Sequence, residues 1–403
     1  MKTSPVSGPA PASGHSSAGQ LLQLFADRPL TRRQVQMLSG LSRSTVTARI
    51  DALLDAGYLT TGATSAGAGR GRPAADLELN ASAMTALAVD LGVTHGRLAV
   101  ADGEGTIHAE HVLESDIAAG PDAVLDRVST TLEKMLADTG RAQRSLAGLG
   151  IGVPGPVHWE SGDVARSLTM PGWDHFPLAA RLAERFGVPV LAENDANLLG
   201  FGEVRAGWPE SHIAVFVKIG TGIGAAIVVD GHVLRGHTAA EGDIGHVKVP
   251  GIEGPCTCGA TGCLAAGASG RAMAAALSGG GRTVQASRDV VELVRAGDPE
   301  AVRVVVQAGR WLGAVLADAV GLLNPDVVII GGDMAMAHEH LLVGIREAVL
   351  ARVQPLASAH LNLTNARLGD RAGILGAVEM VRDTHFSTHS VDKALAARQA
   401  SSG

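Results

Sequence analysis

The chain has 403 residues, of which 46% are hydrophobic and only 3% aromatic, and its mean hydropathy is +0.20. Length and composition indicate a folded protein of roughly two to four domains, and they exclude a disordered chain and a secreted mini-scaffold. The net charge of −7 hides an asymmetry, because residues 28–72 hold seven arginines against two aspartates, whereas residues 81–403 hold 25 basic and 35 acidic side chains. A basic module followed by an acidic body predicts an anionic partner for the first part only.

The first 19 residues are rich in Ser, Pro, Gly and Ala and lack the apolar core of a signal peptide. We expect them to form a flexible leader. Charged residues such as Lys218 and Asp230 interrupt the richest apolar stretches, so no apolar run approaches the ~18 residues that span a bilayer. These features predict a soluble, cytoplasmic protein with no membrane partner.

Residues 20–80 are predicted to form a winged helix-turn-helix. The expected segments are helices around residues 21–25, 32–38 and 43–56 and strands at residues 58–60 and 77–79. A short turn containing Gly40 leads to Ser42, which can cap the third helix. The side chains of that helix expected to face inward are Val46, Ile50, Leu53 and Leu54. The alternative is a small helical cap joined to the body by a Gly-rich linker.

The third predicted helix opens with polar side chains that suit base edges and phosphates, as a recognition helix in the major groove requires. These candidate DNA-binding residues are Arg43, Ser44, Thr45 and Thr47. The Gly-rich segment 67–73 is the expected tip of the wing, where Arg70 and Arg72 would enter a narrow minor groove. Double-stranded DNA is therefore the predicted anionic partner.

Residues 81–385 show strands alternating with helices, which is the pattern of an α/β protein. The predicted strands cover residues 86–91, 97–101, 106–112, 147–153, 188–192, 212–218, 224–229 and 327–330, and the predicted helices cover residues 121–137 and a segment from residue 196. Several strands end in Gly-rich turns, whose backbone N–H groups can cradle phosphates where several such turns converge. Residues 386–403 are assigned as a tail without a readable motif.

Glu193, Asn194 and Asp195 stand at a predicted strand-to-helix junction. Asp195 could merely cap the helix, which is a common role for aspartate at that position. Alternatively, Asn194 and Asp195 could hold a polyol, with Asp195 accepting a proton from one hydroxyl. The residue pattern alone leaves both interpretations open.

The three cysteines of the chain, Cys256, Cys258 and Cys263, lie within eight residues, and His246 precedes the first of them by ten. An odd number of clustered thiols is not a disulfide framework and points to a reducing compartment. Three thiolates and one imidazole complete the closed tetrahedral shell of a structural Zn²⁺ site. The alternative is a set of unrelated thiols.

Taken in order, these motifs resemble those of the ROK family of bacterial repressors and sugar kinases. The motifs are Asp90-Leu91-Gly92, Gly152-Val153-Pro154-Gly155-Pro156, Glu193-Asn194-Asp195-Ala196-Asn197, Gly220-Thr221-Gly222-Ile223-Gly224, Gly242-Asp243-Ile244-Gly245-His246 and the loop from Cys256 to Cys263. The resemblance covers about residues 20–385, because the N-terminal module resembles that of the family's repressor branch. It implies a two-lobed, actin-like ATPase fold with a sugar cleft between the lobes, in a homodimer or homotetramer.

The resemblance also implies roles for individual residues. Asp195 matches the catalytic base of the kinases, and Asn194 matches a sugar ligand. His246 matches a residue that binds zinc and faces the sugar, and the three cysteines match the other zinc ligands. Asp243 stands where the kinases carry a sugar-binding glutamate, so it is a further candidate ligand residue.

The chain departs from the kinase pattern at several of these positions. In the first phosphate motif, Val93 replaces a Gly and His95 replaces a Lys, so a branched side chain fills the space where a phosphate would approach the backbone. Asp243 is one methylene shorter than glutamate, and Ala265 replaces a second sugar-binding glutamate. Asp333 adds a negative charge near the position expected for the nucleotide. These changes argue against ATP as a cofactor and against kinase activity.

The sequence therefore predicts a DNA-binding transcriptional repressor that is not an enzyme. It would bind a palindromic operator and respond to a sugar or sugar derivative held in a kinase-like cleft. The first alternative is an active ATP-dependent sugar kinase with an N-terminal DNA-binding module, which Asp195 and the turn at residues 220–224 favour. The second alternative is a constitutive DNA-binding protein whose cleft is vestigial.

Overall fold

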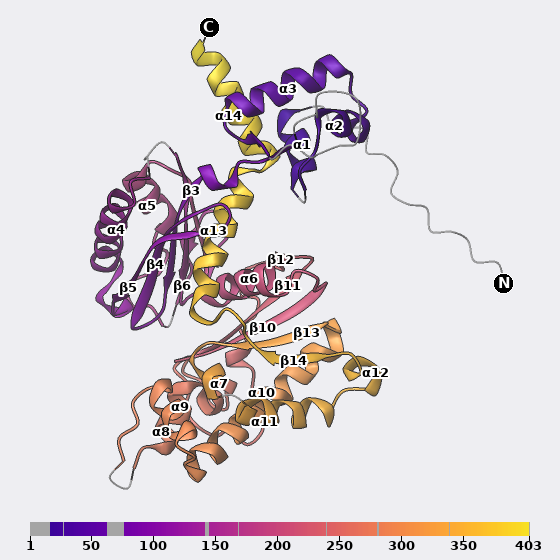
Figure 1. Cartoon of the computed structure of the whole chain (residues 1–403). Helices are drawn as coiled ribbons and strands as arrows, with labels where there is room; N and C mark the ends of the chain where they lie inside the picture. The colour runs from indigo at the N-terminus through magenta and orange to yellow at the C-terminus, as the bar shows by residue number, and fades with distance from the viewer. Residues whose placement is uncertain are drawn as a thin grey trace, which may run out of the picture.

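The computed structural model describes residues 17–26, 28–62, 76–141, 145–167, 169–238, 240–279, 282–337 and 339–402. Figure 1 shows two α/β lobes, with a small helical module next to the first lobe and to the C-terminal helix. The predicted wing tip with Arg70 and Arg72, and residues 1–16 of the predicted leader, lie outside the described residues.

The N-terminal module consists of short helices and a two-stranded antiparallel sheet. Its elements are α1 (Ala18–Leu22), α2 (Arg32–Ser39), α3 (Arg43–Asp55), β1 (Leu59–Thr61) and β2 (Leu77–Leu79). Gly40 has a φ of 70°, which ends α2, and the Ser42 hydroxyl accepts a hydrogen bond from the Thr45 backbone N–H, which begins α3. The predicted inward-facing residues of α3 are buried, except that Leu54 is only half-buried.

The first lobe contains a five-stranded sheet in the order β5-β4-β3-β6-β9. Its elements are β3 (Thr85–Leu91), β4 (His95–Asp102), β5 (Ile107–Glu114), α4 (Pro121–Asp138), β6 (Leu146–Val153), β7 (Val157–His158), β8 (Asp163–Val164), α5 (Leu178–Phe186) and β9 (Val190–Asn194). Side chains alternate across β3, so Leu87 and Val89 pack under α4 and α5, whereas Ala86 and Ala88 face the opposite layer.

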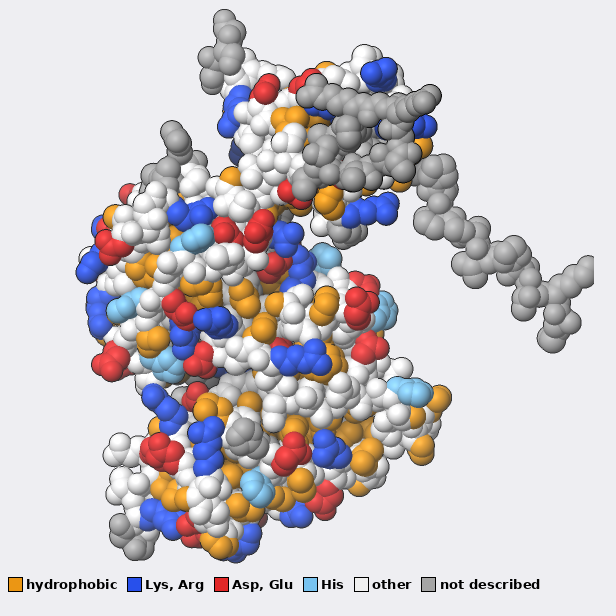
Figure 2. Space-filling view, viewed as in Figure 1, with side chains coloured by type: hydrophobic (Ala, Val, Ile, Leu, Met, Phe, Trp, Pro, Cys, Tyr) orange, Lys and Arg blue, Asp and Glu red, His pale blue; other side chains and the backbone are white. Residues whose placement is uncertain are grey.

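The second lobe contains a sheet in the order β12-β11-β10-β13-β14. Its elements are β10 (Ile213–Ile219), β11 (Ile223–Val229), β12 (His232–Val233), α7 (Leu264–Ala268), α8 (Gly270–Leu277), α9 (Ser287–Arg295), α10 (Pro299–Leu323), β13 (Val327–Gly331), α11 (Glu339–Leu350), α12 (Pro355–Ser358) and β14 (Asn362–Asn365). Val215 and Val217 of β10 share a core with α8 to α11, and Phe216 faces the other way. On the face seen in Figure 2, basic and acidic side chains are interspersed over both lobes.

Helix α10 is long and apolar enough, by length and composition, to cross a bilayer, and it is the one such helix among the described residues. It packs against α7, α8 and α11, and it buries Val305, Leu312 and Leu316 completely or almost completely. These contacts are those of a core helix in a globular domain.

Two helices, α6 (Asp195–Gly207) and α13 (Ala372–His385), lie between the sheets (Figure 1). Helix α6 packs on β10 and β11, α13 packs on β3 and β6, and the two helices pack against each other. Their backbones approach so closely that a Cβ on Gly202 would lie 2.0 Å from the carbonyl oxygen of Ala372. A Cβ on Gly376 would likewise lie 2.2 Å from the carbonyl oxygen of Leu198, so this contact requires glycine.

Residues 386–403, predicted to be a tail, instead contain helix α14 (Thr388–Ser402). Its backbone at Thr388 meets Gly19 of α1, and the Asp392 carboxylate accepts a hydrogen bond from the Gly19 N–H at 2.8 Å. Helix α1 begins at Ala18, inside the predicted leader, because Ser17 forms a capping box with Gln20. The tail prediction was wrong because this helix gains its stability from tertiary contact with α1, and it carries no strong amphipathic pattern.

The predicted α/β architecture is confirmed. Every predicted strand and helix is present, with ends that differ by at most two residues where an end was predicted, except in the first helix. That helix was predicted at residues 21–25 and is instead α1 (Ala18–Leu22) followed by a short 3₁₀ turn at Gln23–Phe25.

Candidate functional site

Four charged side chains meet where the two lobes face each other. Asp90 stands at the end of β3, Asp195 begins α6, Lys218 lies near the end of β10, and Asp333 follows β13. Strands β3, β6 and β9 are parallel, as are β10 and β13, so their carboxyl ends share one edge of each sheet. Lys218 interacts electrostatically with all three carboxylates. We call these four residues the Lys218 cluster.

Within the Lys218 cluster, the ammonium Nζ of Lys218 donates a short hydrogen bond to Oδ2 of Asp195. Burial alone would lower the pKa of Lys218, but the carboxylates of Asp195 and Asp90 outweigh it and raise that pKa above its ordinary value. Asp195 is 7% exposed. The matched kinase base is therefore already bound to a charged donor, and a hydroxyl proton would compete with that donor for the carboxylate.

Lys218 was not among the residues selected from the sequence. It is the single charged residue of an apolar strand, and it stands two residues before the turn that starts at Gly220. A lysine at the carboxyl end of a buried strand needs an acidic partner. This requirement could have identified Lys218 as a candidate site residue from the sequence. The partner, 23 residues earlier in the chain, could be identified only from the fold.

Asn194, and not Asp195, caps α6. Its Oδ1 accepts hydrogen bonds from the N–H groups of Ala196 and Asn197, and its Nδ2 donates to the carbonyl oxygen of Gly155 at 3.1 Å. The interpretation of Asp195 as the cap is therefore wrong, because the cap position belongs to the preceding residue. Asn194 also ties the start of α6 to the Gly152–Pro156 turn, which holds the matched base in place.

A second polar network adjoins the first. Glu193, 3% exposed, accepts hydrogen bonds from Arg235 at 2.8 Å and from Asn197 at 3.1 Å. Asn197 Nδ2 also donates to Glu241 at 3.1 Å, and the Arg235 guanidinium stacks on the Trp159 ring, 3.5 Å from its centroid. Arg235, the cation of this network, is therefore already paired with a carboxylate.

The environment of Asp90 disfavours the ionised form of its carboxyl group. Burial raises the pKa of its carboxyl to about 6, while Lys218 opposes that rise and Asp195 adds to it. Its carboxylate lies against the first turn of α13, because a Cβ on Gly373 would be 2.2 Å from Oδ2. The end of β3 and the start of α13 are thus in direct contact next to the Lys218 cluster.

The turn after β3, where the kinases have a phosphate loop, closes as a tight hairpin. The Gly92 N–H donates to the carbonyl oxygen of His95 at 2.8 Å, and the Val93 carbonyl oxygen accepts a hydrogen bond from Ile117 at 2.9 Å. Val93 is half-buried. The Gly92 N–H and the Val93 carbonyl oxygen are therefore already hydrogen-bonded within the first lobe.

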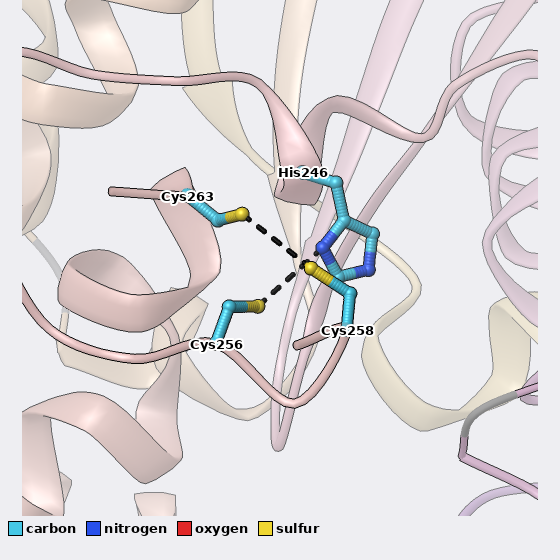
Figure 3. Close-up of side chains that lie close together, drawn as sticks. All are labelled: His246, Cys256, Cys258 and Cys263. Carbon is cyan, nitrogen blue, oxygen red and sulfur yellow. Dashed lines mark hydrogen bonds between the residues drawn. The ribbon is translucent and has the colours of Figure 1, made fainter. Parts of the chain in front are cut away.

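His246, Cys256, Cys258 and Cys263 point toward one another (Figure 3), and their ligand atoms all lie within 4.8 Å. His246 Nδ1 is 3.5 Å from Sγ of Cys256, and the Sγ atoms of Cys258 and Cys263 are 3.6 Å apart. In a tetrahedral zinc site, Zn–S bonds of ~2.3 Å and Zn–N bonds of ~2.0–2.1 Å put two sulfurs ~3.8 Å apart and a sulfur and a nitrogen ~3.6 Å apart. The four residues can hold a metal ion without rearrangement.

Neighbouring residues support this cluster. Lys248 Nζ lies 3.0 Å from Sγ of Cys263, and a cation there favours the thiolate. The carboxylate of Asp243 lies 4.0 Å from Nε2 of His246, on the side of the ring away from the sulfurs. Asp243 is exposed, whereas Ala265 is 7% exposed and offers no polar group.

The start of strand β11 contacts both the segment that carries His246 and the first turn of α6. Gly245, beside His246, packs against the Ile223 carbonyl, and Gly224 packs against Ala196 at the start of α6. The two predicted groups, Asn194 with Asp195 and Asp243 with His246, thus lie near the same end of β11, and the hydrogen bond from Asn197 to Glu241 joins the two segments that carry them.

The candidate DNA-binding residues lie at the start of α3. Arg43, Ser44 and Thr47 are exposed, and Thr45 is half-buried. The hydroxyl of Ser42 contacts those of Ser44 and Thr45 at 2.9 and 2.8 Å, so these three hydroxyls form one local set. Arg70 and Arg72 cannot be placed, since they lie outside the described residues.

Comparison with known proteins gives consistent matches. A sequence profile described as "ROK family" matches residues 86–384. The xylose repressor of Bacillus spizizenii is 28% identical over 370 residues, covering 91% of this chain and 94% of its own, and the glucokinase of Halalkalibacterium halodurans is 30% identical, covering 74% and 95%. A solved ROK family transcriptional regulator, described as a homologue of the E. coli MLC protein, is 25% identical with a TM-score of 0.78 and covers 93% of this chain and 98% of its own.

Replacing Asp90 with Asn should stabilise the protein above pH 6. Because folding raises the pKa of Asp90 from 3.8 to about 6, the folded state binds this proton more tightly, and the contribution of Asp90 to the free energy of unfolding falls as pH rises from about 4 to about 6. We expect Asp90→Asn to raise that free energy by about 1–3 kcal/mol at pH 8 and by little at pH 4. Denaturant unfolding at both pH values measures this.

The exposed Asp138→Asn on α4 is the matched control for the Asp90 variant, because it removes the same charge far from the cluster. It should change stability by less than about 0.5 kcal/mol at either pH. A loss of stability in Asp90→Asn at pH 8 would show that the carboxylate is net favourable there and would contradict the prediction.

Proposed function

Because the chain belongs to the ROK family, we propose that it is a transcriptional repressor that binds operator DNA through its N-terminal module and is controlled by a sugar bound between its lobes. The observation that carries this proposal is the extent of the likeness. Residues 81–403 make up about 80% of the chain, yet the xylose repressor match covers 91% and so extends into the N-terminal module. The glucokinase match covers 74%.

The N-terminal module, residues 18–80, is proposed as the DNA-binding domain. The exposed polar start of α3, with Arg43, Ser44 and Thr47, supports its assignment as the recognition helix. A homodimer or homotetramer would present two such helices to the half-sites of a palindromic operator. Residues 81–385 would then form the sensor.

Helix α13 offers a route from the sensor to the DNA. It begins beside Asp90 at the cleft and ends near Tyr58, whose ring lies 5.2 Å from that of His385. Just beyond it, the Phe386 carbonyl accepts a hydrogen bond from Gln23 of the module at 2.7 Å. A ligand that moves one lobe relative to the other would therefore move the module through packed helices.

The cleft favours sensing over phosphoryl transfer. Lys218 occupies the carboxylate of the matched base Asp195, Ala265 offers no acceptor to a sugar, and Val93 fills the first phosphate turn. The second candidate function is a sugar kinase, which the 30% identity to a glucokinase favours. We propose that ATP is not a cofactor and that the protein acts in the cytoplasm.

We propose that the metal bound by His246, Cys256, Cys258 and Cys263 is a structural Zn²⁺. Three thiolates and one imidazole suit zinc and leave no position for a catalytic water. The bound metal would fasten the loop before α7 and fix the His246 ring beside the cleft.

The full chain should select a specific palindromic sequence from a randomised DNA pool, and a sugar should weaken that complex. We expect at least one of D-xylose, D-glucose and N-acetyl-D-glucosamine to lower the affinity for the selected DNA by at least about fivefold, as an effector coupling of ~1 kcal/mol requires. Fluorescence anisotropy at fixed salt measures the affinity.

The kinase alternative has its own readout. Sugar-dependent ADP release by the full chain, abolished by Asp195→Asn and unaccompanied by any selected DNA sequence, would replace the repressor assignment with the kinase assignment.

Replacing Arg43 with Ala should lower the affinity for the selected DNA by about 5- to 100-fold, because a side chain that reads a base edge contributes ~1–3 kcal/mol. The exposed Arg346→Ala on α11 removes the same charge from the second lobe and should have little effect. Equal losses in the two variants would indicate a general charge effect and would count against a recognition role for α3.

Replacing Cys263 with Ser should reduce the zinc content from about one ion per chain to near zero and lower the Tm. Cys263 is fully buried, so loss of the metal leaves the loop before α7 without its fastening. Thr257→Ser, in the same loop, is the matched control and should keep both zinc and Tm. Metal analysis measures the zinc content of the wild type and both variants, and thermal unfolding measures their Tm. A wild-type protein that is stable and contains no metal would contradict the assignment.

A further inference from the structure

Five carboxylates and two cations gather around the first turn of α6. Asp90, Asp195 and Asp333 act on Lys218, while Glu193 and Glu241 meet at Asn197, and Glu193 also pairs with Arg235. With all groups ionised, this region carries a net charge of −3. Arg97, which also acts on Asp90, does not offset it, because Arg97 pairs with two further carboxylates, Glu110 and Asp370.

Neither cation of this region is available to an anionic ligand. Lys218 donates to Asp195, and Arg235 is held between Glu193 and the Trp159 ring. An anion that displaced Asp195 from Lys218 would leave a carboxylate that is 7% exposed without its counter-ion. Removing one partner of a buried ion pair is strongly unfavourable. The new contact between the anion and Lys218 would therefore not compensate for the loss of the contact between Lys218 and Asp195.

The same groups favour a ligand that donates hydrogen bonds. Carboxylates accept several, and the hydroxyl groups of a polyol can supply them. The same turn of α6 also holds an acceptor without a partner: Oδ1 of Asn197 is buried, in a residue that is 2% exposed, and has no hydrogen-bond partner among the described residues. Its amide nitrogen cannot exchange places with this oxygen, because the nitrogen donates to both Glu193 and Glu241.

We propose that the effector is an uncharged polyhydroxy compound, a free sugar or sugar alcohol, and that Lys218 and its carboxylates exclude phosphorylated sugars and sugar acids. This inference rests on the proposed function in taking the cleft as the effector site. It goes further by naming the chemical class that the cleft selects and the residues that select it.

Matched ligands test this on the full chain without DNA. D-Glucose is compared with glucose 6-phosphate and D-gluconate, N-acetyl-D-glucosamine with its 6-phosphate, and D-xylose with D-xylonate, by calorimetry and thermal shift. We expect at least one uncharged member to bind, and its charged counterparts to bind at least about tenfold more weakly at low ionic strength. Added salt should narrow the gap, because it screens repulsion.

A charge-neutral variant shows whether the named carboxylates are responsible. Asp333→Asn keeps an acceptor for the Ser287 hydroxyl, which lies 2.7 Å from Asp333 Oδ2, and removes one charge beside Lys218. It should raise the affinity for the charged ligands relative to their uncharged partners by about three- to tenfold. Asp138→Asn, on the outer helix α4, removes the same charge and should leave the ratio unchanged.

Several results would overturn the inference. Tighter binding of a phosphorylated sugar or a sugar acid than of its uncharged counterpart would reverse it, and failure of every uncharged member to bind at high millimolar concentration would remove its basis. An unchanged ratio in Asp333→Asn would show that these carboxylates do not set the selectivity. Because none of these measurements involves DNA, the inference can fail while operator binding stands, and operator binding can fail while the selectivity stands.

Discussion

The close packing of α6 against α13 is the contact on which the arrangement of the whole chain depends. Gly202 and Gly376 let the two backbones touch, and each helix covers one sheet, so the two lobes share a single central layer. The apolar core of that layer continues past Phe386 and Val391 into the N-terminal module, where Leu21 and Leu22 are fully or almost fully buried. Module, central layer and both sheets are therefore mechanically connected.

The start of α6 carries the chemistry because it lies at the junction of these layers. Asn194 caps the helix, so the Asp195 side chain is free to bind Lys218, which comes from the other sheet. An ion pair at this position holds strand ends from two lobes together. It also means that any hydroxyl group that donates to the Asp195 carboxylate must compete with Lys218. His246 and the three cysteines, which could hold a metal ion, lie near the start of β11, and β11 also packs against the start of α6.

Elements with a strong local pattern were predictable from the sequence. The apolar strands β3, β6, β10 and β13 and the amphipathic helix α4 occur where periodicity places them, because each pattern must bury one or both faces. The metal cluster was equally accessible, since three of its ligands come from one eight-residue loop and the fourth from a point ten residues earlier. Helix α14 was not predictable in this way, because its stability comes from α1 at the far end of the chain.

By itself, the sequence indicated the family through the order of its motifs. It also determined the fold class, the contrast between a basic N-terminal module and an acidic body, and the residues that could hold a metal ion, because these follow from composition and from patterns that are close in the chain. Only the tertiary structure decided that Asn194 caps α6, that Lys218 pairs with Asp195, and that α13 extends from Asp90 to the N-terminal module. The physical reason is that an ion pair or a helix contact depends on the direction and depth of side chains. Those are set by how layers pack, and residues distant in the sequence do not reveal them.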